Sequence, residues 1–199
     1  MKNIQLVLDV AGVLITNFSP GFWHETASAS GITYEELKRL FAAEIRKPLW
    51  TGQIGEEDFW FWLARYCPVE PLELKKQLFN NLKTMRAFDL IPKWSEQADI
   101  HLLSNHRSEW LEVLLAPIQP YLTSVTISSE ERCCKPDLQI YSVVASKLIS
   151  GSNIIYVDDQ MRNLAPAESL SWKPVLADPD GQWIQFIEEK LEAWSATIS

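Results

Sequence analysis

Polar residues with nucleophilic or ligating side chains stand directly after short apolar runs of this sequence, and one lysine precedes a proline between two of these runs. A carboxylate can act as a nucleophile, and several carboxylates together bind a hard divalent cation. Hydroxyl, amide and ammonium groups hold the oxygens of an anion. The residues are Asp9, Ser104, Asn105, Lys135, Asp158 and Asp159.

These residue types suit the transfer of a phosphoryl group, which needs a nucleophile, neutralisation of the phosphoryl oxygens and accurate positioning. Asp9 is the candidate nucleophile and would form an aspartyl-phosphate. Ser104 and Asn105 would donate hydrogen bonds to phosphoryl oxygens, and Lys135 would supply the compensating positive charge. Asp9 and the later acidic pair would form an oxygen-rich pocket for Mg²⁺. Because neighbouring carboxylates repel one another, their gathering is itself a reason to expect a cation.

Apolar runs and helical patterns alternate along most of the chain. The runs are Ile4–Leu8, Ala98–Leu103, Ser124–Ile127, Asn153–Val157 and Pro174–Ala177. Each run stops at or just before a polar residue, as a buried strand of a parallel sheet does. The alternation predicts an α/β fold in which helices cover both faces of a parallel sheet. Ligands of such sheets bind beyond the carboxyl ends of the strands, where the polar residues fall.

The stretch from residue 17 to residue 88 breaks this alternation, because it has a helical pattern throughout. Thr33 and Glu36 form a capping-box sequence at the start of one predicted helix. We therefore predict a core made of residues 1–16 and 89–199, with an all-helical cap of residues 17–88 inserted after the first strand. The cap would lie over the strand ends like a lid.

Four motifs in their order resemble the haloacid dehalogenase-like (HAD) hydrolase superfamily, over essentially the whole chain. The motifs are Asp9–Leu14, Leu103–Asn105, Lys135–Pro136, and Val157–Asp159 with Asn163. The match is closest to the subgroup with a small helical cap, which includes sugar-phosphate phosphatases and the N-terminal phosphatase domain of epoxide hydrolases. The resemblance implies a Rossmannoid sheet and a Mg²⁺-dependent phosphatase. It also implies a metal site in which the backbone carbonyl of Ala11 joins Asp9, Asp158 and Asp159.

Ala11 departs from the family pattern. In HAD phosphatases the residue two positions after the nucleophile is usually a second aspartate, which protonates the leaving oxygen and then activates the attacking water. Such help typically contributes about 10²–10⁴-fold, so we expect phosphate binding to survive while ester hydrolysis is reduced. His106 is the candidate substitute acid or base, and a surface histidine at a helix start is the competing interpretation.

Carbon–phosphorus cleavage is a second interpretation. Phosphonoacetaldehyde hydrolases are HAD members with a similar Asp-x-Ala-Gly start, and they use a cap lysine that forms a Schiff base with the aldehyde. Lys47 or Lys38 is the candidate for that role here. A Schiff-base lysine needs a pKa lowered by burial, whereas both lysines have the polar sequence neighbours that are typical of a surface.

A third interpretation is a HAD-fold protein that binds phosphate or a partner without turnover. Its basis is the aromatic content of the cap, which would form a wall for a ligand or an interface instead of packing in the core. The residues are Trp23, Trp50, Trp60 and Trp62. Haloacid dehalogenation is disfavoured, because those family members act without Mg²⁺ whereas Asp158 and Asp159 are retained here.

The composition limits the partners. The chain has 199 residues with 18 Lys and Arg against 26 Asp and Glu, and its formal net charge is −8. This balance argues against nucleic acid as a partner, and no apolar run approaches the roughly 20 residues of a membrane span. Three cysteines are too few for a disulfide framework. We expect a cytoplasmic protein that acts on a small phosphorylated metabolite, and we assign no role to Cys133 and Cys134.

Overall fold

Five parallel strands form the central sheet of the computed structural model, which describes residues 2–17 and 20–198. The strands are β1 (Ile4–Leu8), β2 (Asp99–Ser104), β3 (Ser124–Ile127), β4 (Asn153–Asp158) and β5 (Lys173–Leu176). Their order across the sheet is β3-β2-β1-β4-β5. The order reverses beside β1, which lies between β2 and β4 at the position where open α/β sheets bind ligands.

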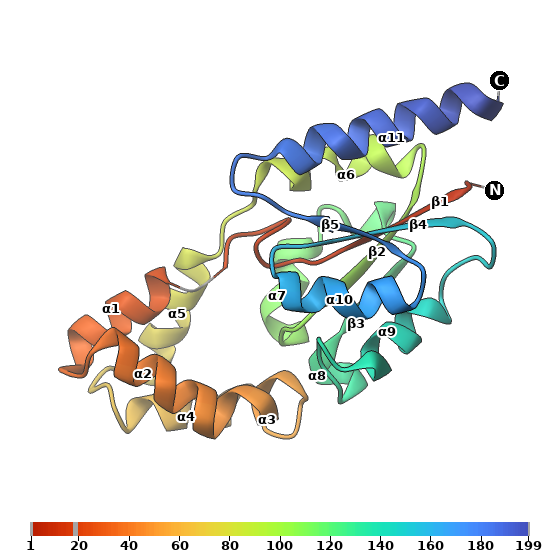
Figure 1. Cartoon of the computed structure of the whole chain (residues 1–199). Helices are drawn as coiled ribbons and strands as arrows, with labels where there is room; N and C mark the ends of the chain where they lie inside the picture. The colour runs from red at the N-terminus through yellow and green to blue at the C-terminus, as the bar shows by residue number, and fades with distance from the viewer. Residues whose placement is uncertain (1, 18–19, 199) are drawn as a thin grey trace.

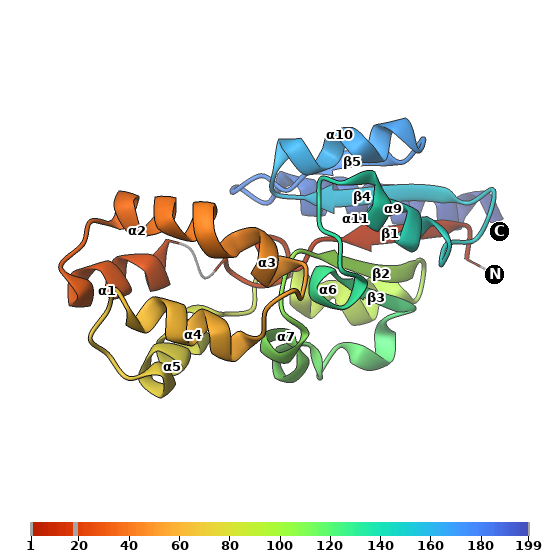
Figure 2. The ribbon, with the colours of Figure 1, turned by 90° about the horizontal axis from the view of Figure 1, so that it is seen from below.

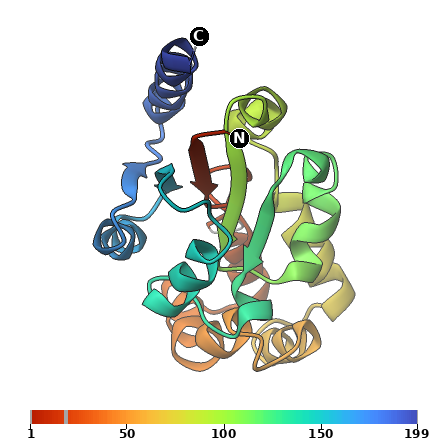
Figure 3. The same cartoon turned by 90° about the vertical axis from the view of Figure 1, so that its right-hand side faces the viewer.

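Helices cover both faces of this sheet (Figure 1 and Figure 3). They are α6 (Arg86–Ser95), α7 (Ser108–Leu115), α9 (Leu138–Ala145), α10 (Met161–Ser169) and α11 (Gln182–Ile198). Successive side chains of a strand point to opposite faces. Leu6 and Leu8 of β1 therefore belong to the apolar layer shared with α6, α7 and α11, whereas Val7 packs in the layer of α9 and α10. This arrangement confirms the predicted α/β fold class.

Further helices are inserted between β1 and β2 and lie together beyond the carboxyl ends of the strands (Figure 1 and Figure 2). They are α1 (Gly21–Ser30), α2 (Tyr34–Leu40), a π-helical turn η1 (Phe41–Ile45), α3 (Arg46–Trp50), α4 (Glu56–Ala64) and α5 (Pro71–Asn81). We call this group the cap. The predicted capping residue of α2 is in place, since the Thr33 hydroxyl accepts a hydrogen bond from the Glu36 amide at 3.2 Å.

Aromatic side chains form the centre of the cap and join it to the core. Trp23, Trp60 and Trp62 are buried, and the rings of Trp60 and Trp110 of α7 lie 5.6 Å apart between their centroids. Core packing therefore accounts for Trp60 and Trp62, whereas Trp23 is buried in the cap and also lines the cavity beside the strand ends. Trp50 is half-buried and belongs to the site.

The predicted strands agree with the observed strands to within one residue at either end. Two short helices, η2 (Gln119–Tyr121) and α8 (Ser128–Glu131), complete the elements of the core. The division of the chain at residues 16 and 88 stays a prediction, and α6, which packs on the sheet, begins before residue 88. Among the described residues, no helix combines the length and the apolar character that a membrane span requires.

Candidate active site

Three neighbouring strands bring the predicted polar residues to one edge of the sheet. Asp9 follows β1, Ser104 ends β2 and Asp158 ends β4, and β1 pairs with both other strands. The Asp9 amide continues the pairing of β1 with β4 by donating to the Val157 carbonyl at 2.9 Å. Residues that are far apart in sequence therefore meet because the sheet register places them side by side.

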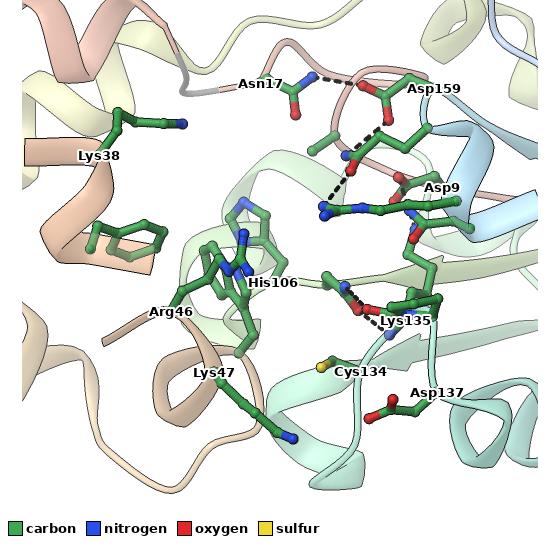
Figure 4. Close-up of a pocket in the computed structure, with 18 of the residues that line it drawn as sticks. Asp9, Asn17, Lys38, Arg46, Lys47, His106, Cys134, Lys135, Asp137 and Asp159 are labelled. Atoms are coloured by element: carbon green, nitrogen blue, oxygen red, sulfur yellow. Dashed lines mark hydrogen bonds and ion pairs between the residues drawn. The ribbon is translucent and has the colours of Figure 1, made fainter. Parts of the chain in front are cut away.

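Lys135 is the centre of this arrangement (Figure 4). Its side chain is 1% exposed, and its Nζ lies 2.9 Å from Asp9 Oδ2 and 2.6 Å from Asp158 Oδ2. The same ammonium donates to the Leu103 carbonyl at 3.2 Å. Although burial acts to lower the pKa of Lys135, the two carboxylates outweigh it and raise that pKa above its usual value. The lysine is thus a permanently charged group beneath the predicted nucleophile.

Asn105 fixes the backbone that carries this lysine. Its Nδ2 donates to the Lys135 carbonyl at 2.8 Å, and its Oδ1 accepts from the Lys135 amide at 2.7 Å. The Asn105 side chain therefore positions Lys135, and its role toward phosphate stays a prediction. Ser104 is 1% exposed, and its Oγ has no hydrogen-bond partner among the described residues. A buried hydroxyl without a partner is costly, and a bound oxyanion would satisfy it.

Asp158 is buried and its carboxylate is saturated with donors. Besides Lys135, Oδ2 accepts from the Tyr156 hydroxyl at 2.5 Å, and Oδ1 accepts from the Gln160 amide at 2.8 Å and from Asn163 Nδ2 at 2.9 Å. These donors lower the pKa of Asp158 against the effect of burial. Tyr156 was not predicted. The sequence signal that could have indicated its contact is the two-residue period of a strand, which places Tyr156 on the same face of β4 as Asp158.

Asp159 is partly exposed and lies beside the loop that follows β1. Its Oδ2 accepts from Asn17 Nδ2 at 3.0 Å, and its Oδ1 accepts from Gln160 Nε2 at 3.3 Å. Gly12, with a φ of +84°, leaves the space that this carboxylate fills, because an added Cβ would lie 2.5 Å from Asp159 Cγ. No sequence pattern indicated that Asn17 contacts Asp159.

Replacement of Gly12 by alanine should displace Asp159 and weaken metal binding by about 10-fold or more. The measurement is the rise in melting temperature caused by Mg²⁺, since a ligand of the native state stabilises it according to its affinity. Gly151→Ala is the matched control: Gly151 also has a positive φ, +80°, but an added Cβ there has no heavy atom within 4 Å. Equal Mg²⁺ stabilisation of the two variants would contradict the contact.

The carboxylates form a cluster that fits a divalent cation. One oxygen from each of Asp9, Asp158 and Asp159 lies within 4.8 Å of the others. Three carboxylates and the Lys135 ammonium leave a net charge of −2, which one Mg²⁺ would balance. Oxygen ligands are also those that Mg²⁺ prefers. Burial, followed by the charges of the other two aspartates, raises the pKa of the Asp9 carboxyl, while Lys135 opposes the rise.

A cavity of about 510 Å³ lies between the strand ends and the cap. Its core wall includes Asp9, Ala11, Asn105, Lys135 and Asp159. Its cap wall consists of Trp23, Lys38, Phe41, Arg46, Lys47 and Trp50. The site thus has the reacting groups on the core side and cationic and aromatic groups on the cap side. Ser104 and Asp158 are not among the lining residues.

His106 lines the same cavity and is 1% exposed. Its ring packs against Trp50 of the cap, with centroids 5.6 Å apart, so the surface interpretation of this histidine is wrong. Burial lowers the pKa of His106 to about 4. The imidazole is therefore neutral at neutral pH, where it cannot serve as a general acid and is a weak base.

The buried neutral His106 should make the fold sensitive to acid. Because the unfolded chain binds the proton near pH 6.5 and the folded chain only near pH 4, stability is lost as the pH falls between these values. Between about pH 7 and about pH 5, the wild type should lose about 2 kcal/mol more unfolding free energy than His106→Gln. Denaturant titrations at both pH values measure this difference. Equal losses would show that His106 is not buried in its neutral form.

The sequence matches no protein-family model and no curated protein. Among solved structures, a HAD-family enzyme from Bacteroides thetaiotaomicron superposes with a TM-score of 0.79 at 18% identity, covering 92% of this chain and 97% of that chain. A HAD-like family hydrolase from Porphyromonas gingivalis gives 0.75 at 21% identity, covering 94% and 97%. The chain has the HAD fold.

Solved structures with this fold contain chemically different ligands. The Bacteroides enzyme is also known in complex with magnesium and inorganic phosphate (TM-score 0.72, 18% identity, 86% of this chain and 92% of that chain). An L-2-haloacid dehalogenase from Xanthobacter autotrophicus, with chloropropionic acid covalently bound, shares the HAD fold at a TM-score of 0.62 and 17% identity, over 88% and 77%. The fold therefore does not determine the activity, which depends on the residues of the site.

Proposed function

We propose that this HAD-fold protein is a Mg²⁺-dependent phosphatase of a small phosphorylated metabolite. The observation that carries the proposal is the buried Lys135 ammonium, held between Asp9 and Asp158 at the foot of the cavity. A fixed positive charge beside a carboxylate nucleophile stabilises the negative charge of a phosphoryl group during transfer.

Asp9 attacks phosphorus, and the bond to the leaving oxygen breaks as the aspartyl-phosphate forms. Lys135 and the Ser104 hydroxyl hold phosphoryl oxygens, and Asn105 keeps Lys135 in position. With alanine at position 11, the leaving oxygen takes its proton from water. A water molecule then attacks the phosphorus of the aspartyl-phosphate, which releases phosphate and restores Asp9. Substrates with good leaving groups depend least on the missing acid.

Asp9 and Asp159 supply the carboxylate oxygens of the metal site, and Ala11 contributes its carbonyl, as the family resemblance implies. Asp158 already accepts four hydrogen bonds, so it acts mainly by holding Lys135. When bound, Mg²⁺ polarises the phosphoryl oxygens and balances the negative charge of the site. Closure of the cap over the cavity would exclude bulk water.

The test is an assay on aryl, acyl and sugar phosphates with Mg²⁺ or with a chelator, for the wild type and for Asp9→Asn. We expect Mg²⁺-dependent phosphate release that the substitution lowers by about 10⁴-fold or more. Binding of beryllofluoride without turnover of any substrate would favour the non-catalytic interpretation. Turnover that persists in chelator would contradict the metal site.

Haloacid dehalogenation is the competing activity. The acidic cluster argues against it, because its net charge of −2 calls for a cation that the family resemblance assigns to phosphatases and not to dehalogenases. Incubation with L-2-chloropropionate should therefore release no chloride above background. Chloride release without Mg²⁺, lost in Asp9→Asn, would replace the phosphatase proposal by dehalogenation.

Carbon–phosphorus cleavage remains a second candidate because of Lys38. This residue lines the cavity, is half-buried, and has a pKa lowered by burial and by the charge of Arg46. A lysine amine with a lowered pKa can condense with an aldehyde and release water. Borohydride reduction in the presence of phosphonoacetaldehyde would then attach the substrate to Lys38, and Lys38→Gln would abolish labelling. Absence of an adduct in the wild type would remove this candidate.

A further inference from the structure

The cap wall of the cavity is cationic, although the chain as a whole carries a net charge of −8. Lys38, Arg46 and Lys47 line it from the cap, whereas none of the cap residues that line it is acidic. These side chains lie across the cavity from Asp9, Lys135 and Asp159, the residues that would surround the transferred phosphoryl group (Figure 4). The additional cations therefore face another part of the substrate.

Arg46 and Lys47 form no close ion pair with the part of the chain that the structure describes. Among the residues that the structure describes, neither has a carboxylate oxygen within 4.0 Å. Both cations, together with Arg162 of α10, oppose the effect of burial on the pKa of the Cys134 thiol, so they lie close to the core wall. Arg46 lines the cavity together with His106, and in Figure 4 Lys47 extends toward Cys134 and Asp137.

Contacts with the core hold the segment that carries these cations. Arg107 Nη1 donates to the Ile54 carbonyl at 2.7 Å, which ties the loop after α3 to the end of β2. Gly52 of that loop lies so close to α8 that an added Cβ would collide with the Ser129 backbone. The Thr51 hydroxyl donates to the Lys47 carbonyl at 2.8 Å. The cationic end of the cap is therefore attached to the core beside the site.

We propose that the substrate is a short phosphate ester that carries a second anionic group, and that Arg46 and Lys47 bind this group; the inference rests on the proposed phosphatase activity. The planar guanidinium of Arg46 can hold a carboxylate or a phosphate through two parallel hydrogen bonds. The carbon segment between the two anionic groups lies against Trp50 and Phe41, which line the same wall. A cavity of about 510 Å³ accommodates only a small molecule, so the carbon segment must be short.

Four propyl phosphates that differ only at carbon 3 test the proposal: methyl, carboxylate, phosphate and ammonium ends. Their dissociation constants for Asp9→Asn with Mg²⁺ are measured by calorimetry, and their kcat/KM values for the wild type by phosphate release. The ester with a carboxylate or phosphate end should bind about 10–100-fold more tightly than propyl phosphate. The ammonium ester should bind most weakly, and added salt should reduce these differences.

Arg46→Gln and Lys47→Gln should each reduce the preference for the anionic end, measured as the ratio of the dissociation constants of propyl phosphate and the anionic ester. Both residues are exposed, so folding should be unaffected. The matched control is Lys76→Gln on α5, a cap lysine that does not line the cavity. The anionic ester that binds more tightly shows whether the second anionic group of the substrate is a carboxylate or a phosphate.

The outcomes separate this inference from the proposed function. Equal turnover of all four esters with Mg²⁺ would overturn the anion site and leave the phosphatase intact. A preference for the anionic end that persists when Arg46→Gln and Lys47→Gln are combined in one variant would also overturn it. An anionic preference in calorimetry that Arg46→Gln removes, without Mg²⁺-dependent turnover of any ester, would support the anion site and contradict the phosphatase.

Discussion

Replacement of Lys135 by methionine should lower the free energy of unfolding by about 3–5 kcal/mol, because it leaves Asp9 and Asp158 as buried carboxylates without their cation. For a chain of this size the melting temperature should fall by about 6–20 °C. Denaturant unfolding near neutral pH, without Mg²⁺, measures the loss. The methionine side chain has nearly the length of lysine, so the effect reports on the charge and not on a cavity.

The pH dependence of this stability loss shows whether the lost charge or altered packing causes it. Burial already raises the pKa of Asp9 in the wild type, and loss of the lysine charge should raise it further. A carboxyl whose pKa is higher in the folded state than in the unfolded state costs stability above its folded pKa. This cost decreases as the pH falls from the folded pKa toward the unfolded pKa, which is about 3.9 for an aspartate. The deficit of Lys135→Met should therefore shrink between about pH 7 and about pH 5.

Lys76→Met provides the comparison. Lys76 pairs with Glu73 at 3.3 Å, and its side chain is 61% exposed, so its loss should cost at most about 1 kcal/mol. A deficit of the same small size for Lys135→Met would show that the ammonium does not bind the two aspartates in solution. A large deficit that does not depend on pH would assign the effect to packing instead of charge.

The sheet could be predicted from the sequence because its central strand β1 is buried along its whole length and the other strands are short, largely apolar runs with a polar end. Ile4–Leu8 and Ser124–Ile127 were predicted at their observed bounds. The π-helical turn at Phe41–Ile45 was not. The apolar spacing there fits an α-helix, and the wider turn depends on how Phe41 and Ile45 pack against the rest of the cap, which local sequence does not encode.

The residues of the site could be predicted from the sequence, but most of the contacts between them could not. Asp9, Lys135 and the acidic pair are brought together as the motifs predicted. The pairing of Asn105 with the Lys135 backbone joins segments 30 residues apart, and no pattern within either segment indicates it. His106 resembled a surface residue because the indole that covers it, Trp50, comes from the cap. Tertiary contacts of this kind follow only from the fold.

Replacement of Ala11 by aspartate should raise the hydrolysis of alkyl phosphates by about 10²–10⁴-fold. Ala11 lines the cavity two residues after Asp9, so a carboxyl at this position can reach the leaving oxygen. The gain should be smaller for aryl phosphates, whose leaving oxygen needs little protonation. Steady-state phosphate release with Mg²⁺ on a matched alkyl and aryl pair measures both effects, and the wild type serves as reference.

The second half of the reaction provides a separate signature of the same substitution. Without a base to activate water, the aspartyl-phosphate of the wild type should accumulate, so that an aryl phosphate gives a burst of about one leaving group per protein before slow turnover. Ala11→Asp should remove the burst by accelerating the attack of water. Ala11→Asn has nearly the same size but cannot exchange a proton, so it should keep both the slow alkyl rate and the burst. If the asparagine variant matched the aspartate variant, the gain would come from packing or polarity, and position 11 would not limit the chemistry.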